Sequence, residues 1–492
     1  MSDTQLDRVA RWTPLLVLAY FAVQFIIRIA FSANLETDEA QFVGHTHLAL
    51  GYGNSHPPLY NWLVAGALAL TGGSWSASLA LVKNLLLTGT YLLSFDIARR
   101  VTGRALTGLI IVTSFLLIPQ IVWKSQITLA HSVLVMFAVV AIMHAVVRIV
   151  ERGDMGSFVW LGAAAAIGAL AKYNLFLLLL AVLIAAFSIP TIRARLFVPR
   201  LAISLALLAA LTAPHFVWVF HNLGQSTQRM VKLERENPAF VGIDLPGIGI
   251  DGMLDLAVAL VTWVGPLLVA WFAIRHASRP ATEPMPAGQP APDDEKVRAY
   301  AQLFGRTALI AFAIFGAIVL VGDLHSVRER YLTPLLMPLP FWLAFSWPLE
   351  PYARAPLRFI GIGAIVAALM VTAWPAWITF GREQFAFPYE SFATAVEEAV
   401  SGPFAVVASQ DKIAANIAIR VDGATMWEEG ALPKQVLVLW DPKLGGSIPA
   451  KLTTRIFEGY EPRGEMMVMA FPYDNFSGQT ARLNALLYTR RP

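Results

Sequence analysis

One stretch of the sequence, from Asn34 to Leu63, concentrates side chains that can do acid–base chemistry or bind a metal ion. It contains no Lys or Arg, and its carboxylates and imidazoles are Glu36, Asp38, Glu39, His45, His47 and His56. Carboxylates accept protons from hydroxyl groups, and imidazoles serve as acids, bases or metal ligands near neutral pH. The same composition is compatible with a solvated acidic loop that does no chemistry. Which interpretation holds depends on where the neighbouring elements place these side chains.

The composition is that of a membrane protein. Hydrophobic residues make up 57% and charged residues 14% of the 492 residues, and the mean hydropathy is +0.59. Apolar runs of about 20 residues, the length that crosses the core of a bilayer, recur between Trp12 and Ile378. We therefore expect an all-α polytopic membrane protein. Lys and Arg in cytoplasmic loops explain the net charge of +4, so no nucleic acid partner is expected.

Eleven apolar segments are expected to span the membrane. They are residues 13–32, 78–98, 105–122, 128–149, 157–171, 174–190, 199–220, 253–275, 300–321, 331–348 and 357–378. The segment Leu59–Leu70 is too short to span, and Pro57-Pro58 and Gly72-Gly73 flank it, so we expect a juxtamembrane helix there. Arg8 and Arg11 precede the first segment, but no small-residue cleavage site follows it, so it is expected to stay as a span.

The distribution of positive charge predicts the orientation. If the N-terminus is cytoplasmic, the cytoplasmic loops carry more than twice as many Lys and Arg residues as the opposite loops. Positive charge collects on the cytoplasmic side of membrane proteins, so we expect the N-terminus there. An odd number of spans then places the C-terminus outside. Residues 34–77 become the first periplasmic loop, with its juxtamembrane helices.

Two segments differ in composition from the spans. Residues 278–298 are rich in Pro and Ala and are expected to form a flexible cytoplasmic linker. In residues 379–492, short apolar runs typical of strands alternate with polar stretches and with a helix-like stretch. The runs are Phe404–Ala408, Val436–Trp440 and Met466–Ala470, and the helix-like stretch is Ser391–Val400. We therefore predict a membrane domain over 1–378 and a small periplasmic α/β domain over 379–492.

In this topology, cations and polar residues gather on the same face as Asp38 and Glu39. They are Trp123, Lys124, Lys172, Tyr173, His221, Arg229, Lys232, Arg235, Asp244, Asp251, His325, Arg328, Arg330 and Tyr331. Cations there suit the phosphate of a lipid, and a carboxylate suits the activation of an attacking hydroxyl. The combination predicts group transfer from a phosphate-linked lipid. Lys83 and His131 are further candidates, because an ionisable group within or at the edge of a span is costly.

Structural roles stay open for several of these residues. Lys172 and Arg330 fit interfacial anchors whose long side chains reach the head groups. Lys83 can pair with Asp96 or with a main-chain carbonyl. His215, near a span end, is typical of a hydrogen-bonded interfacial histidine.

Four groups of motifs occur in a fixed order along the chain. They are Asp38-Glu39-Ala40 with Gly51-Tyr52 and His56-Pro57-Pro58-Leu59-Tyr60-Asn61-Trp62-Leu63; Leu170-Ala171-Lys172-Tyr173; Ala213-Pro214-His215 with Trp218 and Asn222; and Arg330-Tyr331-Leu332-Thr333-Pro334 with Pro338. This ordered set resembles the GT-C glycosyltransferases, and within them the bacterial branch related to protein O-mannosyltransferases and to the aminoarabinose transferase of lipid A. The chain departs from that transferase at Gln41, which replaces an Arg, and at His56, which replaces a Lys. His131 stands where many relatives carry an Asp.

The resemblance implies a GT-C fold, a polyprenyl-phosphate-linked sugar donor and an inverting transfer on the periplasmic face of the bacterial inner membrane. Asp38 matches the catalytic carboxylate, the base on the acceptor hydroxyl, and Glu39 is its companion. The expected substrate-binding residues are His56, Tyr60, Lys83, Lys124, His131, Lys172, Tyr173, Arg328, Arg330 and Tyr331, of which Lys172, Arg328 and Arg330 would bind phosphate. A divalent cation stays open, and no cofactor is certain. The absence of Cys excludes a thiolate metal site.

We predict a membrane glycosyltransferase that moves a sugar from undecaprenyl phosphate to a lipid or surface-glycan acceptor, such as lipid A or the core of lipopolysaccharide. One alternative is a protein O-glycosyltransferase of the mannosyltransferase type. The other is a transporter or flippase of lipid-linked sugars. Charges on one face and the lack of a recognisable internal repeat argue against transport.

Overall fold

The computed structural model describes most of the chain. It describes all residues except 1–2, 46–47, 53–55, 225–249, 281–293, 323, 381–384, 428–430, 446–447, 450–451, 453–458, 476–477 and 492. Five residues singled out in the sequence therefore lie outside the described residues, namely His47, Arg229, Lys232, Arg235 and Asp244. So do residues 281–293 of the expected linker.

The chain divides into two compact units. The first comprises Met1–Ala22, Ala49–Tyr60 and Lys83–Met370, and the second comprises Val23–Leu48, Asn61–Val82 and Val371–Pro492. Helices α2 (Thr13–Phe31), α4 (Leu59–Leu70), α5 (Trp75–Thr102) and α18 (Ala355–Phe380) contribute residues to both units. The acidic stretch around Asp38 thus clusters with the C-terminal part of the chain.

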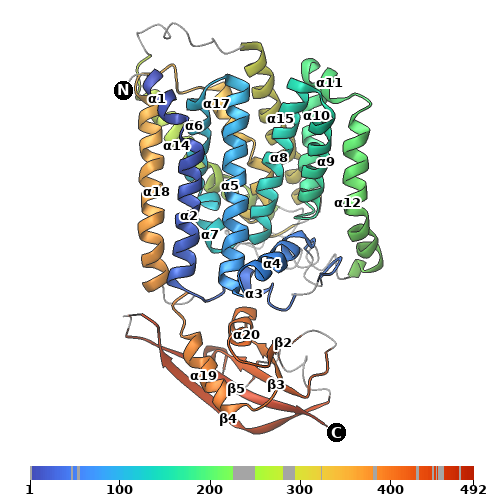
Figure 1. The fold of residues 1–492 in the computed structure, drawn as a ribbon, viewed down its shortest axis with the longest axis vertical. Helices are drawn as coiled ribbons and strands as arrows, with labels where there is room; N and C mark the ends of the chain where they lie inside the picture. The colour runs from blue at the N-terminus through green and yellow to red at the C-terminus, as the bar shows by residue number, and fades with distance from the viewer. Residues whose placement is uncertain are drawn as a thin grey trace. The chain divides into compact units, whose positions relative to one another are not determined.

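The first unit is a bundle of helices (Figure 1). Besides the shared helices it contains α1 (Asp3–Ala10), α6 (Ala105–Leu116), the π-helix η1 (Gln120–Lys124), α7 (Ser125–Ile127), α8 (Ala130–Arg152), α9 (Met155–Ala169), α10 (Leu175–Phe187), α11 (Pro190–Leu196), α12 (Leu201–His221), α14 (Ile250–His276), α15 (Asp294–Val321), α16 (Glu329–Leu336) and α17 (Leu339–Ser346).

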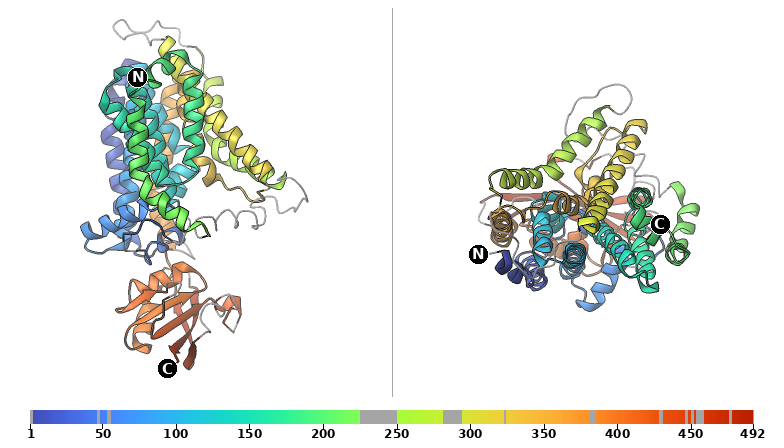
Figure 2. Two further views of the ribbon diagram at one scale, coloured as in Figure 1. Left: turned by 90° about the vertical axis from the view of Figure 1, so that its right-hand side faces the viewer. Right: turned by 90° about the horizontal axis from the view of Figure 1, so that it is seen from above.

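Helix α8 lies inside this bundle, and 83% of its most apolar window is buried. It packs against α9, which in turn packs against α12. The three helices are labelled in Figure 1, and Figure 2 shows the bundle from two further sides. Gly162 of α9 permits the approach of α12, because a Cβ atom at this position would lie 2.7 Å from the Ser204 carbonyl oxygen. Ser204 Oγ donates a hydrogen bond to the Phe158 carbonyl across the same contact (2.7 Å). Small residues and hydroxyl groups are the usual contacts between membrane helices.

Seven described helices are long and apolar enough to cross a membrane, or up to nine if each of two bent helix pairs counts as one span. The pairs are α6 with η1–α7, bent by 77°, and α10 with α11, bent by 115°. Two expected spans fall below this criterion: residues 157–171 form α9, of 15 residues, and residues 331–348 form α16 and α17, of 8 residues each. The count by this criterion is thus lower than the eleven predicted.

Proline explains the breaks inside these apolar runs. Pro119 precedes η1, Pro190 is the first residue of α11, and Pro338 precedes α17. A proline has no N–H to donate, and its ring clashes with the backbone of the preceding helical turn, so a helix usually ends shortly before it. The helix predicted over Leu59–Leu70 is confirmed at those bounds, and Gly72 and Gly73 follow it with φ of 63° and 86°.

The C-terminal part of the second unit is an α/β fold. Its five-stranded sheet has the order β2-β1-β3-β5-β4. The strands are β1 (Phe404–Ala408), β2 (Ala424–Met426), β3 (Gln435–Trp440), β4 (Tyr460–Pro472) and β5 (Thr480–Arg490), and the helices are α19 (Tyr389–Ala399), α20 (Asp411–Ala418) and the 3-10 helix η2 (Pro442–Leu444). Strands β2, β1 and β3 are parallel, while β5 pairs antiparallel with β3 and β4.

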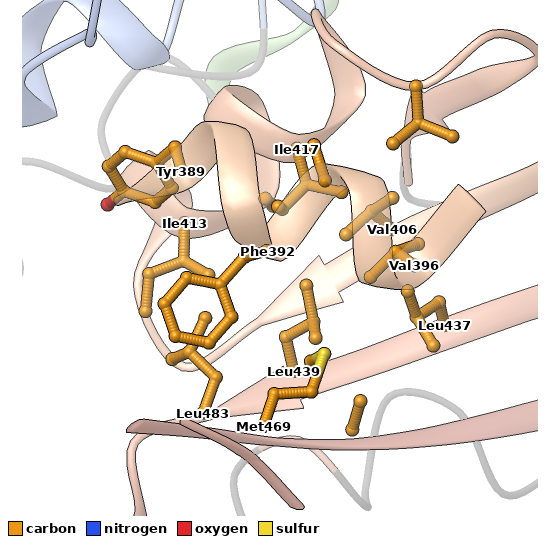
Figure 3. Close-up of a cluster of buried hydrophobic side chains, with 14 of the residues drawn as sticks. Tyr389, Phe392, Val396, Val406, Ile413, Ile417, Leu437, Leu439, Met469 and Leu483 are labelled. Carbon is orange, nitrogen blue, oxygen red and sulfur yellow. The ribbon is translucent and has the colours of Figure 1, made fainter. Parts of the chain in front are cut away.

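Two apolar clusters cover the two faces of this sheet. Leu437 and Leu439 of β3 face the cluster under α19 and α20, with Phe392 and Ile417 from these helices (Figure 3). Val436, Val438 and Trp440 belong to the opposite cluster. Alternate residues of a strand point to opposite faces, so this strand is buried on both sides. The predicted strands and helix of this domain are confirmed, whereas β2, β5 and α20 were not predicted.

Candidate active site

The part of the acidic stretch around Asp38 forms one short capped helix in the second unit, α3 (Thr37–Ala40). Glu36 precedes it, and the Glu36 carboxylate accepts the Thr37 N–H, while the Glu39 carboxylate accepts the Glu36 N–H at 3.2 Å. This reciprocal capping satisfies main-chain donors that a helix start leaves unpaired. The Glu-Thr-Asp-Glu sequence therefore fixes the backbone on which Asp38 stands.

Glu39 is held in a buried ion pair. Its Oε2 lies 2.8 Å from Arg28 Nη2, and the two side chains are only 1% and 3% exposed. The Arg28 guanidinium also donates to the carbonyls of Ser32 and Asn34 and lies over the Phe385 ring, 4.8 Å from its centroid. These are the contacts of a carboxylate that orders the loop. The sequence interpretation missed Arg28, although a guanidinium inside an apolar span is itself a signal.

Asp38 differs from Glu39 in its surroundings. It is half-buried, whereas Glu39 and Glu36 are buried. Lys412 of α20 lies 3.8 Å from the Glu36 carboxylate. Asp38 is thus the most exposed of these three acidic residues, while Glu36 and Glu39 make the capping bonds of α3. The catalytic roles predicted for Asp38 and Glu39 stay predictions.

A second group of expected residues meets in the first unit at the start of α8. The His56 ring stacks on the His131 ring, with centroids 4.2 Å apart, and Tyr60 lies 5.5 Å from His131. Lys172 Nζ donates to Ser132 Oγ at 2.6 Å. The Leu59 N–H donates to the Leu170 carbonyl at 3.2 Å and joins the two motifs through their main chains. The structure thus brings four of the predicted substrate-binding residues together.

The same geometry bears on metal binding. The rings of His56 and His131 are inclined by only 13°. An imidazole binds a metal ion in the plane of its ring, so two stacked, nearly parallel rings do not direct their lone pairs at one ion. Among the residues that the structure describes, no group of three His, Asp or Glu residues is placed to hold a metal ion.

Tyr173 connects this group to the end of α12. Its hydroxyl lies 3.1 Å from His215 Nε2, and His215 Nδ1 lies 2.6 Å from the Leu50 carbonyl oxygen. The carbonyl can only accept, so Nδ1 carries the proton and Nε2 accepts from the phenol. Burial raises the pKa of Tyr173 to about 12, so the phenol stays a donor. His215 is thus a buried, hydrogen-bonded histidine that ties the Tyr173 hairpin to the first loop.

Gly51 belongs to the same contact. Trp218 stacks on His215 with the ring planes 14° apart, and it covers Gly51. A Cβ atom on Gly51 would lie 2.2 Å from two atoms of the indole. The Gly-Tyr motif and the Trp of the later motif therefore depend on each other for a steric reason.

Lys83 of α5 contacts the irregular segment before α8, and Lys124 belongs to this segment. Lys83 is 2% exposed and donates to the Gln126 carbonyl at 3.1 Å, which is the carbonyl partner expected as an alternative to Asp96. Lys124 is exposed at the end of the π-helix η1. Leu129 then takes a positive φ of 66° directly before α8. A π-turn and a left-handed leucine are costly, and such features concentrate at functional sites.

Arg328 and Arg330 stand at the start of α16. Arg328 is exposed and precedes the helix, and the Arg330 guanidinium lies 5.4 Å from the centroid of the Tyr331 ring. The Asn174 amide nitrogen lies 3.4 Å from the Tyr331 carbonyl, so α16 touches the Lys172–Tyr173 hairpin.

Two buried aspartates of α14 hold the segment before α16. Asp251 lies 2.6 Å from His325 Nδ1, and Asp255 accepts the Val327 N–H at 3.3 Å. Both aspartates are 0% exposed. Their four-residue spacing puts them on one face of the helix. Their carboxylates therefore bind the residues that precede Arg328 and Arg330, which we call the arginine segment, and do not face solvent.

The site residues belong to different units. Asp38 and Glu39 lie in the second unit, and all the predicted substrate-binding residues lie in the first. Contacts within the first unit join His56, Tyr60, His131, Lys172, Tyr173 and Tyr331 into one connected set. The substrate-binding roles of these residues stay predictions.

Comparison with solved structures defines the class of the fold. The crystal structure of ArnT from Cupriavidus metallidurans without ligand superposes with a TM-score of 0.60, covering 97% of this chain and 98% of ArnT at 12% identity. The structure of the same protein bound to undecaprenyl phosphate superposes with a TM-score of 0.56, over 96% and 98% of the two chains, also at 12% identity. The fold is that of the GT-C membrane glycosyltransferases.

Sequence comparison identifies the family. The lipopolysaccharide core galacturonosyltransferase RgtB of Rhizobium johnstonii is 31% identical over 422 residues, which cover 84% of this chain and 82% of RgtB. RgtA of the same organism, also named a lipopolysaccharide core galacturonosyltransferase, is 29% identical over 68% of this chain and 64% of RgtA. The family model for dolichyl-phosphate-mannose-protein mannosyltransferases matches residues 55–218. The chain belongs to the same family of membrane glycosyltransferases as RgtB, and it is an enzyme of the transferase class.

Proposed function

We propose that the protein transfers a galacturonosyl group from a polyprenyl-phosphate-linked donor to the core of lipopolysaccharide. The observation that carries this proposal is the similarity to RgtB, which extends over most of both chains. The ArnT structure with undecaprenyl phosphate supports a polyprenyl phosphate as the lipid part of the donor. The proposal thereby narrows the expected lipid or glycan acceptor to the core of lipopolysaccharide.

In the proposed reaction, a hydroxyl oxygen of the acceptor attacks the anomeric carbon of the donor sugar. The bond from this carbon to the phosphate oxygen breaks, and polyprenyl phosphate leaves. Asp38 takes the proton of the hydroxyl as general base, in keeping with its half-buried position. Lys172, Arg328 and Arg330 bind the phosphate, whose negative charge increases as the bond breaks.

The proposed topology follows from the charge distribution. The N-terminus lies in the cytoplasm, and the first loop and the α/β domain after residue 378 lie in the periplasm. The protein resides in the inner membrane. The membrane domain of residues 1–378 binds the donor, and the domain of residues 379–492 is separate in composition.

A protein acceptor is the second candidate, because the matching family model is named for protein mannosyltransferases. Its match covers residues 55–218, which contain the His56 and Lys172 motifs but not the chain after residue 378. The comparisons with named transferases give no support to a flippase.

Mass spectrometry of cells with and without the gene separates these acceptors. Lipid A, lipopolysaccharide core and envelope proteins are isolated from both strains and their masses are compared. The proposal predicts that the core alone loses one or more hexuronic acid units when the gene is deleted. A hexose missing from envelope proteins, with an unchanged core, would replace the proposal by protein glycosylation.

A further inference from the structure

The loop that carries Asp38 makes directional contacts with the C-terminal α/β fold, and both belong to the second unit. Helix α3 packs against α20. We propose that this α/β fold holds Asp38 in its working position, with Asn416 of α20 as the main positioning residue. The proposal rests on the function proposed above, in which Asp38 is the base.

Asn416 and Leu35 exchange two hydrogen bonds. The Leu35 N–H donates to Asn416 Oδ1 at 2.9 Å, and Asn416 Nδ2 donates to the Leu35 carbonyl at 2.9 Å. Asn416 is 0% exposed, and Leu35 is three residues before Asp38. The side-chain amide thus forms hydrogen bonds with both the N–H and the carbonyl of Leu35, as the main chain of a neighbouring strand would. Two such bonds fix the position and the direction of the chain at this point.

Asn34 repeats the arrangement from the loop side. Its Nδ2 donates to the carbonyls of Phe385 and Phe387, both at 2.8 Å, and its Oδ1 accepts from Arg420 Nη2 at 2.7 Å. Arg420 Nη1 also donates to Asn416 Oδ1 at 3.1 Å. One network of amides and a guanidinium therefore holds two consecutive loop residues.

Glu36 is the third consecutive residue with a partner in this fold. Lys412, one turn before Asn416 on α20, lies 3.8 Å from its carboxylate. Asn34, Leu35 and Glu36 are all buried and lead directly into α3. Polar contacts at three successive positions specify a position more narrowly than apolar packing does, because their strength depends on angle as well as distance.

The position of a general base matters for the chemical step. A displacement of about 1 Å in a reacting group can cost about 100-fold in rate. Loss of the Asn416 contacts should therefore lower kcat while leaving the KM for the donor nearly unchanged, because the predicted donor-binding residues lie in the first unit. A general loss of folding would instead lower the amount of active enzyme and leave the rate per active molecule unchanged.

The test uses the full-length protein in detergent or nanodiscs, with a polyprenyl-phosphate-linked sugar and isolated lipopolysaccharide. Asn416→Ala is expected to lower kcat about 10- to 100-fold with a donor KM within about twofold of the parent, and to raise hydrogen exchange in the peptide that contains residues 34–40. Gln435→Ala is the matched control, because it removes a side-chain-to-carbonyl bond (Gln435 Nε2 to Ser401 O, 3.2 Å) elsewhere in the α/β fold.

Two further variants sharpen the result. Asn416→Asp keeps an acceptor for the Leu35 N–H beside Arg420, but it places a buried carboxylate oxygen against the Leu35 and Lys412 carbonyls to which the amide nitrogen donates, so its kcat should fall below that of the parent. Arg420→Gln removes the charge that binds Asn34 and serves as the second test where Asn416→Ala does not fold. Its kcat should fall, and exchange in residues 34–40 should rise.

Parent-like kcat and exchange in Asn416→Ala, or in Arg420→Gln where Asn416→Ala does not fold, would overturn the positioning role. The same holds if Gln435→Ala lowers kcat as much as these variants do. Failure of the proposed function looks different, because Asp38→Asn would then retain transfer whatever the Asn416 variants do.

Discussion

The contacts of Glu39 predict that its carboxylate acts through the loop and not on the substrate. The informative change is Glu39→Gln, which keeps the size of the side chain and removes its charge. It leaves the Arg28 guanidinium buried beside an amide, at a site where the parent pair is 3% and 1% exposed with a separation of 2.8 Å.

The expected loss of stability follows from this burial. Removing one partner of a buried ion pair costs about 3–5 kcal/mol, because the remaining charge stays buried. Glu39→Gln should cost less than this, about 2–3 kcal/mol, because Arg28 keeps its bonds to the carbonyls of Ser32 and Asn34, and the amide oxygen of the introduced side chain still accepts a bond. Arg28→Gln should cost a similar amount, since it leaves the Glu39 carboxylate buried.

A double-mutant cycle measures the coupling directly. The parent, Glu39→Gln, Arg28→Gln and the double variant are unfolded by heat in the same detergent, and initial rates of sugar transfer are measured for each. The loss in the double variant should be smaller than the sum of the two single losses by about 0.5–3 kcal/mol, the range found for residues in contact. Transfer should be reduced but measurable in both single variants.

A different pattern would refute the structural role. If Glu39→Gln abolishes transfer without a loss of stability, while Arg28→Gln transfers sugar at the parent rate, then Glu39 acts on the substrate. Additive stability losses in the double variant would show that the ion pair does not couple the two residues.

Three further outcomes follow from the contacts in the first unit. Gly51→Ala should destabilise the protein by about 1–3 kcal/mol, because its Cβ would lie 2.2 Å from the Trp218 ring, and Trp218→Leu in the same chain should restore much of the loss; thermal unfolding measures both, and an unchanged Gly51→Ala would contradict the contact. Lys172→Ala and Arg330→Ala should each weaken binding of polyprenyl phosphate about tenfold, as measured by equilibrium binding, and unchanged affinity in both would remove their phosphate role. Asp255→Ala leaves the Val327 N–H without its carboxylate partner, so stability should fall by about 1–3 kcal/mol and donor affinity should fall with it, whereas parent-like values of both would contradict the anchoring of the arginine segment.

Much of the secondary structure could be predicted because its signals are local. Helix α4 begins after a Pro-Pro pair and ends before a Gly-Gly pair, and it has the predicted bounds Leu59–Leu70. Strand β1 likewise has the predicted bounds Phe404–Ala408. The bends were harder to predict, because hydropathy over residues 105–122 and 331–348 does not register the effect of one proline on the hydrogen-bond ladder.

The partners of the acidic loop could not be predicted, because they are far away in the sequence. Asn416 and Leu35 are 381 residues apart, and α20 itself has no motif that marks it. In the sequence, Asp38 and Glu39 are two neighbouring carboxylates, and nothing in the residue types distinguishes their roles. Only the contacts with Arg28 and with the Glu36 cap distinguish the buried Glu39 from the half-buried Asp38.

We propose that this membrane glycosyltransferase uses Asp38 as the base that activates the acceptor hydroxyl. The most direct measurement is the initial rate of transfer by purified Asp38→Asn, from a polyprenyl-phosphate-linked galacturonic acid to lipopolysaccharide core. General-base catalysis contributes about 10²- to 10⁴-fold, so we predict a loss of that size with donor affinity close to that of the parent. Transfer by Asp38→Asn at the parent rate would contradict the claim.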